Sequence, residues 1–84
     1  MNTVSRLLIR EQYLRLIADL MSGCVLVDMA HEDDVKRARR VESLKQVLAV
    51  TEKFRREYAP DEVLDFEKLR GRVMERIEPK QEDA

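Results

Sequence analysis

The sequence predicts an all-α fold, either a small three-helix bundle or a helical hairpin plus a third helix, with short connections. Three observations support this prediction. The 84 residues include only 2 glycines and 2 prolines, so little interrupts a helix. Charged residues make up 39% of the chain and alternate with aliphatic residues at steps of three and four, as on one face of a helix. Tryptophan is absent, so we expect an aliphatic core.

The first predicted helix covers residues 3–21. On a helical wheel, one broad arc collects most of its apolar side chains, which are Leu7, Ile9, Tyr13, Leu14, Leu16, Ile17, Leu20 and Met21. An arc this wide predicts contact with two neighbouring helices. Ser22-Gly23 is expected to end the helix, with Gly23 in the left-handed conformation that glycine adopts after helix C-termini.

Residues 24–30 are unusually apolar for a connection. Six of these seven residues are apolar, and the seventh is Asp28. As a helix the segment would be apolar on all sides, whereas as an extended segment it would place Val25 and Val27 on the same side. The sequence leaves both interpretations open.

Two further helices follow. The second begins within residues 31–34, whose acidic side chains suit the positive end of a helix dipole, and it ends at Tyr58 before Ala59-Pro60. The third covers residues 60–77, with Pro60 at its first position. Gly71 indicates either a close helix neighbour or a locally soft turn. The expected core includes Leu14, Ile17, Leu44, Leu48, Phe66 and Val73.

Length and composition predict one helical domain, residues 1–78, followed by a polar tail, residues 79–84. No apolar run approaches the roughly 18 residues that a membrane span needs. Residues 1–10 contain no signal-peptide pattern. The single cysteine excludes an internal disulfide. We therefore expect a cytoplasmic protein that does not bind membranes.

Few residues suit catalysis. Asp28, His31 and the acidic residues 32–34 combine carboxylates with the one histidine, a combination that can bind a metal ion. The absence of a second histidine favours acids that stabilise a helix N-terminus instead. Cys24 is interpreted as a small core residue. We therefore predict no enzymatic activity, no metal, no cofactor and no small-molecule substrate.

Two kinds of interaction surface remain. Apolar residues outside the expected core predict a protein-docking surface that includes Leu8, Val25, Leu26, Val27, Met29 and Leu64. The densest basic run contains Lys36, Arg37, Arg39 and Arg40, and arginine suits phosphate contacts. Acidic residues four positions earlier, however, predict intrahelical ion pairs on a solvated face.

The sequence thus predicts a non-enzymatic protein–protein interaction module. It would act as a regulator, adaptor or inhibitor of a larger protein machine, in the small single-domain format common among phage and mobile-element regulators. Its partner would be another protein or, in a homodimer, a second copy. The alternative is a small dimeric transcriptional or nucleic-acid-binding regulator that uses the basic run.

Overall fold

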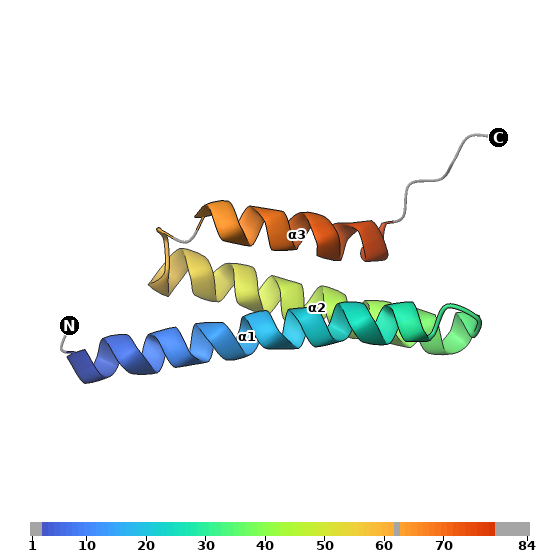
Figure 1. Cartoon of the computed structure of the whole chain (residues 1–84), viewed down its shortest axis with the longest axis horizontal. Coiled ribbons are helices and arrows are strands. Elements are labelled where there is room, and N and C mark those ends of the chain that lie inside the picture. The colour runs from blue at the N-terminus through green and yellow to red at the C-terminus, as the bar shows by residue number, and fades with distance from the viewer. Residues whose placement is uncertain (1–2, 62, 79–84) are drawn as a thin grey trace.

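The computed structural model describes residues 3–61 and 63–78, and the side chains of residues 3–61 and 65–78. Within these residues the chain forms three α-helices: α1 (Thr3–Met29), α2 (Asp34–Tyr58) and α3 (Val63–Ile77). The first two make a long antiparallel hairpin, and α3 lies along its middle, with its C-terminal end toward the α1–α2 connection (Figure 1). The molecule is elongated, with extents of 53 × 24 × 15 Å. The predicted all-α, three-helix architecture is confirmed.

The first helix does not end where the sequence predicted. It continues through Ser22-Gly23 to Met29, so residues 24–29 are helical and the extended interpretation is wrong. Among the described residues no glycine has a positive φ, so Gly23 is not a helix cap. A Cβ atom on Gly23 would lie 2.8 Å from Cδ1 of Leu44. Gly23 therefore lets α2 approach α1 closely in the C-terminal part of α1.

The second helix begins and ends as predicted. Asp33 is its N-cap, because the Asp33 carboxylate accepts a hydrogen bond of 3.0 Å from the Lys36 backbone N–H. The helix stops at Tyr58, before Ala59-Pro60. The predicted start of the third helix is wrong, since Pro60 and Asp61 form a turn and α3 begins at Val63. These residues form the connection that reverses the chain direction between α2 and α3.

The core lies where the three helices meet. Its buried residues are Leu20, Cys24, Val27, Leu44, Leu48, Phe66 and Val73, and Ile17 packs against them partly buried. Five of the six predicted core residues therefore contribute to it. Leu14 does not, because its side chain is 53% exposed. The buried hydroxyl of Thr51 donates a hydrogen bond of 2.7 Å to the Val47 carbonyl, so it is satisfied within α2.

Two ion pairs and a ring contact attach α3 to the hairpin. The Arg76 guanidinium donates hydrogen bonds of 3.0 and 3.2 Å to the Asp28 carboxylate of α1. Arg70 pairs with Glu52 of α2. The Arg55 guanidinium of α2 lies 5.3 Å from the centre of the Phe66 ring.

No helix passes close to Gly71. This residue is exposed, and a Cβ atom built on it would meet no atom within 4 Å. Of the two alternatives for Gly71, the close helix neighbour is therefore wrong, and a close approach is found at Gly23 instead.

Candidate protein-docking surface

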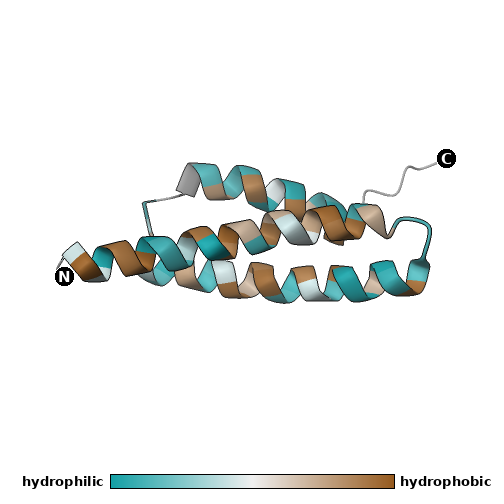
Figure 2. Ribbon diagram, turned by 60° about the horizontal axis from the view of Figure 1, so that its bottom comes forward, coloured by the Kyte–Doolittle hydropathy of each residue, from teal (hydrophilic) through white to brown (hydrophobic). Residues whose placement is uncertain are grey.

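The side of α1 that points away from α2 and α3 is apolar along its length. We call it the outer α1 face; it consists of Val4, Leu7, Leu14, Ala18, Met21, Val25 and Met29. All seven side chains are exposed, and the six large ones are 53–75% exposed. Hydrophobic residues recur from one end of α1 to the other, as Figure 2 shows. This face has no covering element among the described residues.

The outer α1 face is distinct from the face that packs into the core. Tyr13, Leu16, Leu20, Cys24 and Val27 are the buried residues of α1. The outer residues lie about 100–200° around the helix from Leu20. The sequence predicted one broad arc in contact with two neighbours, and this is wrong for Leu7, Leu14 and Met21. Two helices cover only the core side of α1, so the rest of the arc faces solvent.

The spacing along the outer α1 face is that of a helix-packing seam. Val4, Ala18 and Val25 fall on one seven-residue repeat, whose remaining position is Glu11. A second repeat, three residues later, contains Leu7, Leu14 and Met21, and its next position is Asp28, which pairs with Arg76. These two repeats correspond to the a and d positions of a heptad, the pattern by which helices pack along their length. Glu11 accepts a hydrogen bond of 3.2 Å from Arg15, one turn away.

The structure separates the six residues that the sequence assigned to docking. Val25 and Met29 lie on the outer α1 face, and Leu8 and Leu26 are exposed beside it. Val27 is only 4% exposed, because it lies one heptad from Leu20 on the core side, so its assignment to docking is wrong. The side chain of Leu64 lies outside the described residues.

Sequence reasoning missed three of the outer residues by assigning them to the core-facing arc. Leu7, Leu14 and Met21 lie about 100–140° around the helix from Leu20, whereas the other buried residues of α1 lie within about 40° of it. The residues of both faces recur at intervals of three and four, so this angle, rather than a period, was the signal that could have separated the two faces.

A groove runs beside the outer α1 face, between α1 and α3. Its volume is about 350 Å³, and it is lined by Arg10, Tyr13, Leu14, Ile17, Met21, Asp65, Phe66 and Leu69. Leu14 and Met21 belong both to this groove and to the outer α1 face. The apolar surface therefore continues sideways from α1 onto α3.

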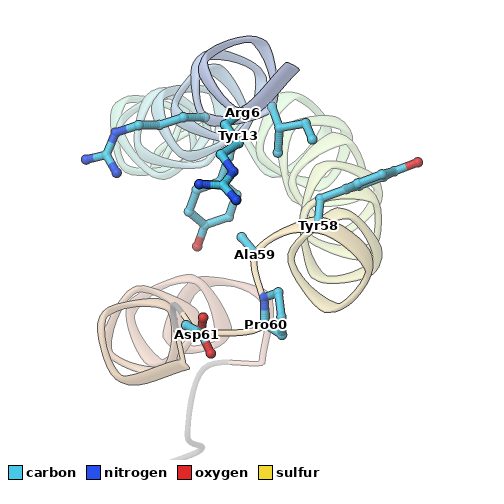
Figure 3. A pocket seen from close by; sticks show the side chains of 8 residues that line it. Arg6, Tyr13, Tyr58, Ala59, Pro60 and Asp61 are labelled. Atoms are coloured by element: carbon cyan, nitrogen blue, oxygen red, sulfur yellow. The ribbon is translucent and has the colours of Figure 1, made fainter. Parts of the chain in front are cut away.

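A second depression lies at the end of the bundle, where α1 meets the α2–α3 connection (Figure 3). It has a volume of about 390 Å³, and its lining includes Arg6, Arg10, Tyr13, Tyr58 and Asp61. The Tyr13 side chain points into the space beside the connection, whereas the Tyr58 hydroxyl points outward. The guanidinium groups of Arg6 and Arg10 and the carboxylate of Asp61 border the same open space, so the depression does not favour a ligand of either charge.

The basic run lies on the first turns of α2. Lys36, Arg37, Arg39 and Arg40 are all exposed, and all except Arg37 line one shallow depression. The predicted intrahelical ion pairs are wrong: within the described residues, none of the four pairs with a carboxylate. The Asp33 carboxylate caps the helix instead.

The groups that could have supported catalysis have structural partners. Burial raises the pKa of the Cys24 thiol, an effect that nearby Arg76 opposes and Asp28 reinforces. A nucleophilic cysteine needs the opposite shift. The Asp28 carboxylate binds Arg76, and His31 Nε2 lies 3.5 Å from Glu32. In the part of the chain that the structure describes, no three metal-ligating side chains converge.

Neither the helices nor comparison with known proteins adds a functional assignment. Among the described residues, no helix combines the length and the apolar character needed to cross a membrane. The chain has no significant match to a family model, a curated protein or a solved structure.

Proposed function

We propose that this protein is a non-enzymatic interaction module that binds a helix of a second polypeptide chain on its outer α1 face. In this role it acts as a regulator, adaptor or inhibitor of the protein it contacts. The observation that supports the proposal is the run of exposed apolar side chains from Val4 to Met29, which is interrupted at Glu11. At 1.5 Å per residue these 25 steps span about 38 Å, enough for a partner helix of similar length.

The size of the exposed surface favours docking over chance exposure. Isolated exposed apolar residues are ordinary on protein surfaces, but a continuous strip of them marks an interaction site. Each large side chain on the face is more than half exposed. Covering it contributes roughly 1–2 kcal/mol. The favourable free energy gained by covering all six residues is similar to the free-energy cost of association, so we expect reversible binding.

Site-specific photo-cross-linking in the cells that produce the protein tests this function. A photo-reactive residue in place of Met21 should yield adducts with another chain, because Met21 is exposed on the apolar strip and also lines the neighbouring groove. The same residue in place of Gln46, which is exposed on α2, is the matched control. Adducts from Met21 but not from Gln46 support the proposal. Equal adducts, or none from either position, contradict it.

One observation favours nucleic-acid binding as a second candidate function. Lys36, Arg39 and Arg40 line one depression near the positive end of the α2 dipole; Asp33 also lines it, but its carboxylate caps α2 and forms no ion pair with these three side chains among the described residues. The net charge of −1 provides no long-range attraction for phosphates.

Fluorescence anisotropy with labelled duplex and single-stranded DNA separates the two candidates. If the basic run binds phosphates, the affinity should fall steeply with added salt and should be lost in the Arg39→Gln/Arg40→Gln variant. The proposed docking function predicts no binding near physiological salt, with either the native chain or the variant.

A further inference from the structure

The outer α1 face has the properties that a twofold interface requires. In such an interface the same patch is used by both subunits, so the patch must complement itself. The face combines large residues such as Leu14 with the small residue Ala18, and both are exposed. Its heptad positions from Val4 to Asp28 include two charged residues, Glu11 and Asp28, and each pairs with an arginine of its own chain. A nearly neutral seam of this kind matches a copy of itself better than a strongly charged partner.

Glu11 determines the orientation of two such helices. In a parallel pair, each a position faces the same a position of the second helix, so the two Glu11 carboxylates would meet within the seam. In an antiparallel pair, a positions face d positions instead. Glu11 then lies opposite Met21 of the second copy, and the repulsion between like charges is avoided. The antiparallel orientation is therefore favoured.

One antiparallel register pairs the large and small residues of the seam, and at its two ends it places Val4 opposite Asp28, which Arg76 of its own chain neutralises. Placing Leu14 opposite Ala18 of the second copy pairs a large side chain with a small one at the centre. The same register places Leu7 opposite Val25 of the second copy. It also brings exposed Arg15 within about 3 Å, along the helix axis, of exposed Asp19 of the second copy. The Arg15 side chain, which pairs with Glu11 of its own chain, would then lie level with this Asp19 on each side of the twofold axis.

The dimensions of the chain fit a dimer of this kind. A typical stable interface buries roughly 800 Å² per partner, which is about an eighth of the 6783 Å² surface of this chain. The outer α1 face runs along the long side of a 53 Å molecule. A helix with apolar residues on both faces is normally covered on both sides. In the dimer, α1 becomes a central helix, with α2 and α3 on one side and the second α1 on the other.

We infer that the outer α1 face is covered by the same face of a second copy of this chain, with the two α1 helices antiparallel and Leu14 opposite Ala18 of the second copy. This inference rests on the proposed function and supplies its partner.

Analytical ultracentrifugation over a range of concentrations tests the association. The native chain should approach twice its mass of 9.9 kDa as its concentration rises. Leu14→Glu places two uncompensated charges in the seam and should weaken the dimer at least roughly 100-fold. Val50→Glu is the matched control, because Val50 is equally apolar and exposed but lies on α2. Circular dichroism checks that both variants keep their helices.

Cysteine cross-linking tests the orientation without a disruptive charge. In a Cys24→Ala background, copies carrying Leu7→Cys are mixed with copies carrying Val25→Cys and oxidised. The antiparallel register predicts a cross-linked pair in this mixture. It predicts none for Leu7→Cys alone, because the two residues would lie about 27 Å apart along the axis. Cross-linking of Leu7→Cys alone, without the mixed pair, would show a parallel dimer and overturn the inference.

The association experiment separates failure of this inference from failure of the proposed function. A native chain that stays monomeric, or a Leu14→Glu variant that dimerises as well as Val50→Glu, overturns the second copy as partner. Photo-adducts from Met21 that contain a different protein would then leave the docking function standing. Adducts that contain only this chain would support the dimer.

Discussion

Replacing each of the two glycines by alanine tests the packing of α1 against α2. Both Gly23 and Gly71 lie inside helices, and neither has a positive φ. Alanine stabilises a helix interior by roughly 0.8–1 kcal/mol relative to glycine. The two positions differ in their surroundings, because a Cβ atom at Gly71 meets nothing and one at Gly23 lies 2.8 Å from Leu44 Cδ1. The pair therefore separates helix propensity from packing.

We expect the two variants to change the free energy of unfolding differently. Gly71→Ala should raise the free energy of unfolding by about 0.5–1 kcal/mol. Gly23→Ala gains the same propensity, but Leu44 is 1% exposed and must shift within a filled core. Overpacking of this kind costs about 1–3 kcal/mol, so Gly23→Ala should range from neutral to about 2 kcal/mol destabilising. Urea denaturation followed by circular dichroism, at one protein concentration, measures both values.

A third variant identifies the atom responsible. Leu44→Val removes Cδ1, so Gly23→Ala should be better tolerated in that background than in the native chain. The double-mutant cycle should give a favourable coupling of about 0.5–3 kcal/mol. If Gly23→Ala stabilises the native chain as much as Gly71→Ala does, α1 and α2 do not approach closely at Gly23, and this packing argument is refuted.

Four further outcomes follow from the core, the helix cap and the thiol. Leu48→Ala should lower the free energy of unfolding by about 2–5 kcal/mol, because Leu48 is buried. Val50→Ala, on the exposed side of α2, should change it by only a few tenths of a kcal/mol. Equal losses of stability in the two denaturation curves would show that the core side of α2 is misassigned. Asp33→Ala removes the N-cap acceptor and should cost about 0.5–2 kcal/mol, while Asp33→Asn should retain most of the native stability. Cys24 should react slowly with iodoacetamide in the folded chain and quickly in denaturant; fast reaction of the folded chain at neutral pH would contradict its burial. Because burial raises the pKa of Cys24 above 9.0, the unfolded chain ionises first and stability should fall as the pH rises through that value, less so in Cys24→Ala.

The fold class could be predicted from the sequence because helical periodicity is a local property. Asp33 and Ala59-Pro60 marked the two ends of α2 for the same reason, since a cap and a proline act on adjacent residues. The end of α1 could not be predicted in this way. A glycine is compatible with both a helix cap and a helix interior. The role of Gly23 is decided by the position of Leu44, which lies on another helix.

The candidate site was predictable only in part, because exposure depends on how far the neighbouring helices reach. Val25 and Met29 were assigned to docking, since they lay outside the expected core. Leu14 was assigned to the core, because a helical wheel shows which residues share a side but not which side is covered. Neither α2 nor α3 covers that side of α1, so Leu14 is left in solvent.

The continuity of α1 at Gly23 links the core to the proposed interface. If α1 ended at Met21, Val25 and Met29 would belong to a connection, and the outer α1 face would lose its last turns. Its C-terminal part packs on α2 only because Gly23 has no side chain to collide with Leu44. The contact that completes the core therefore also aligns Val25 with Leu7 and Leu14 on one straight face. An alanine that forces α1 away from α2 at this point should weaken docking as well as stability, although Gly23 is not part of the outer α1 face.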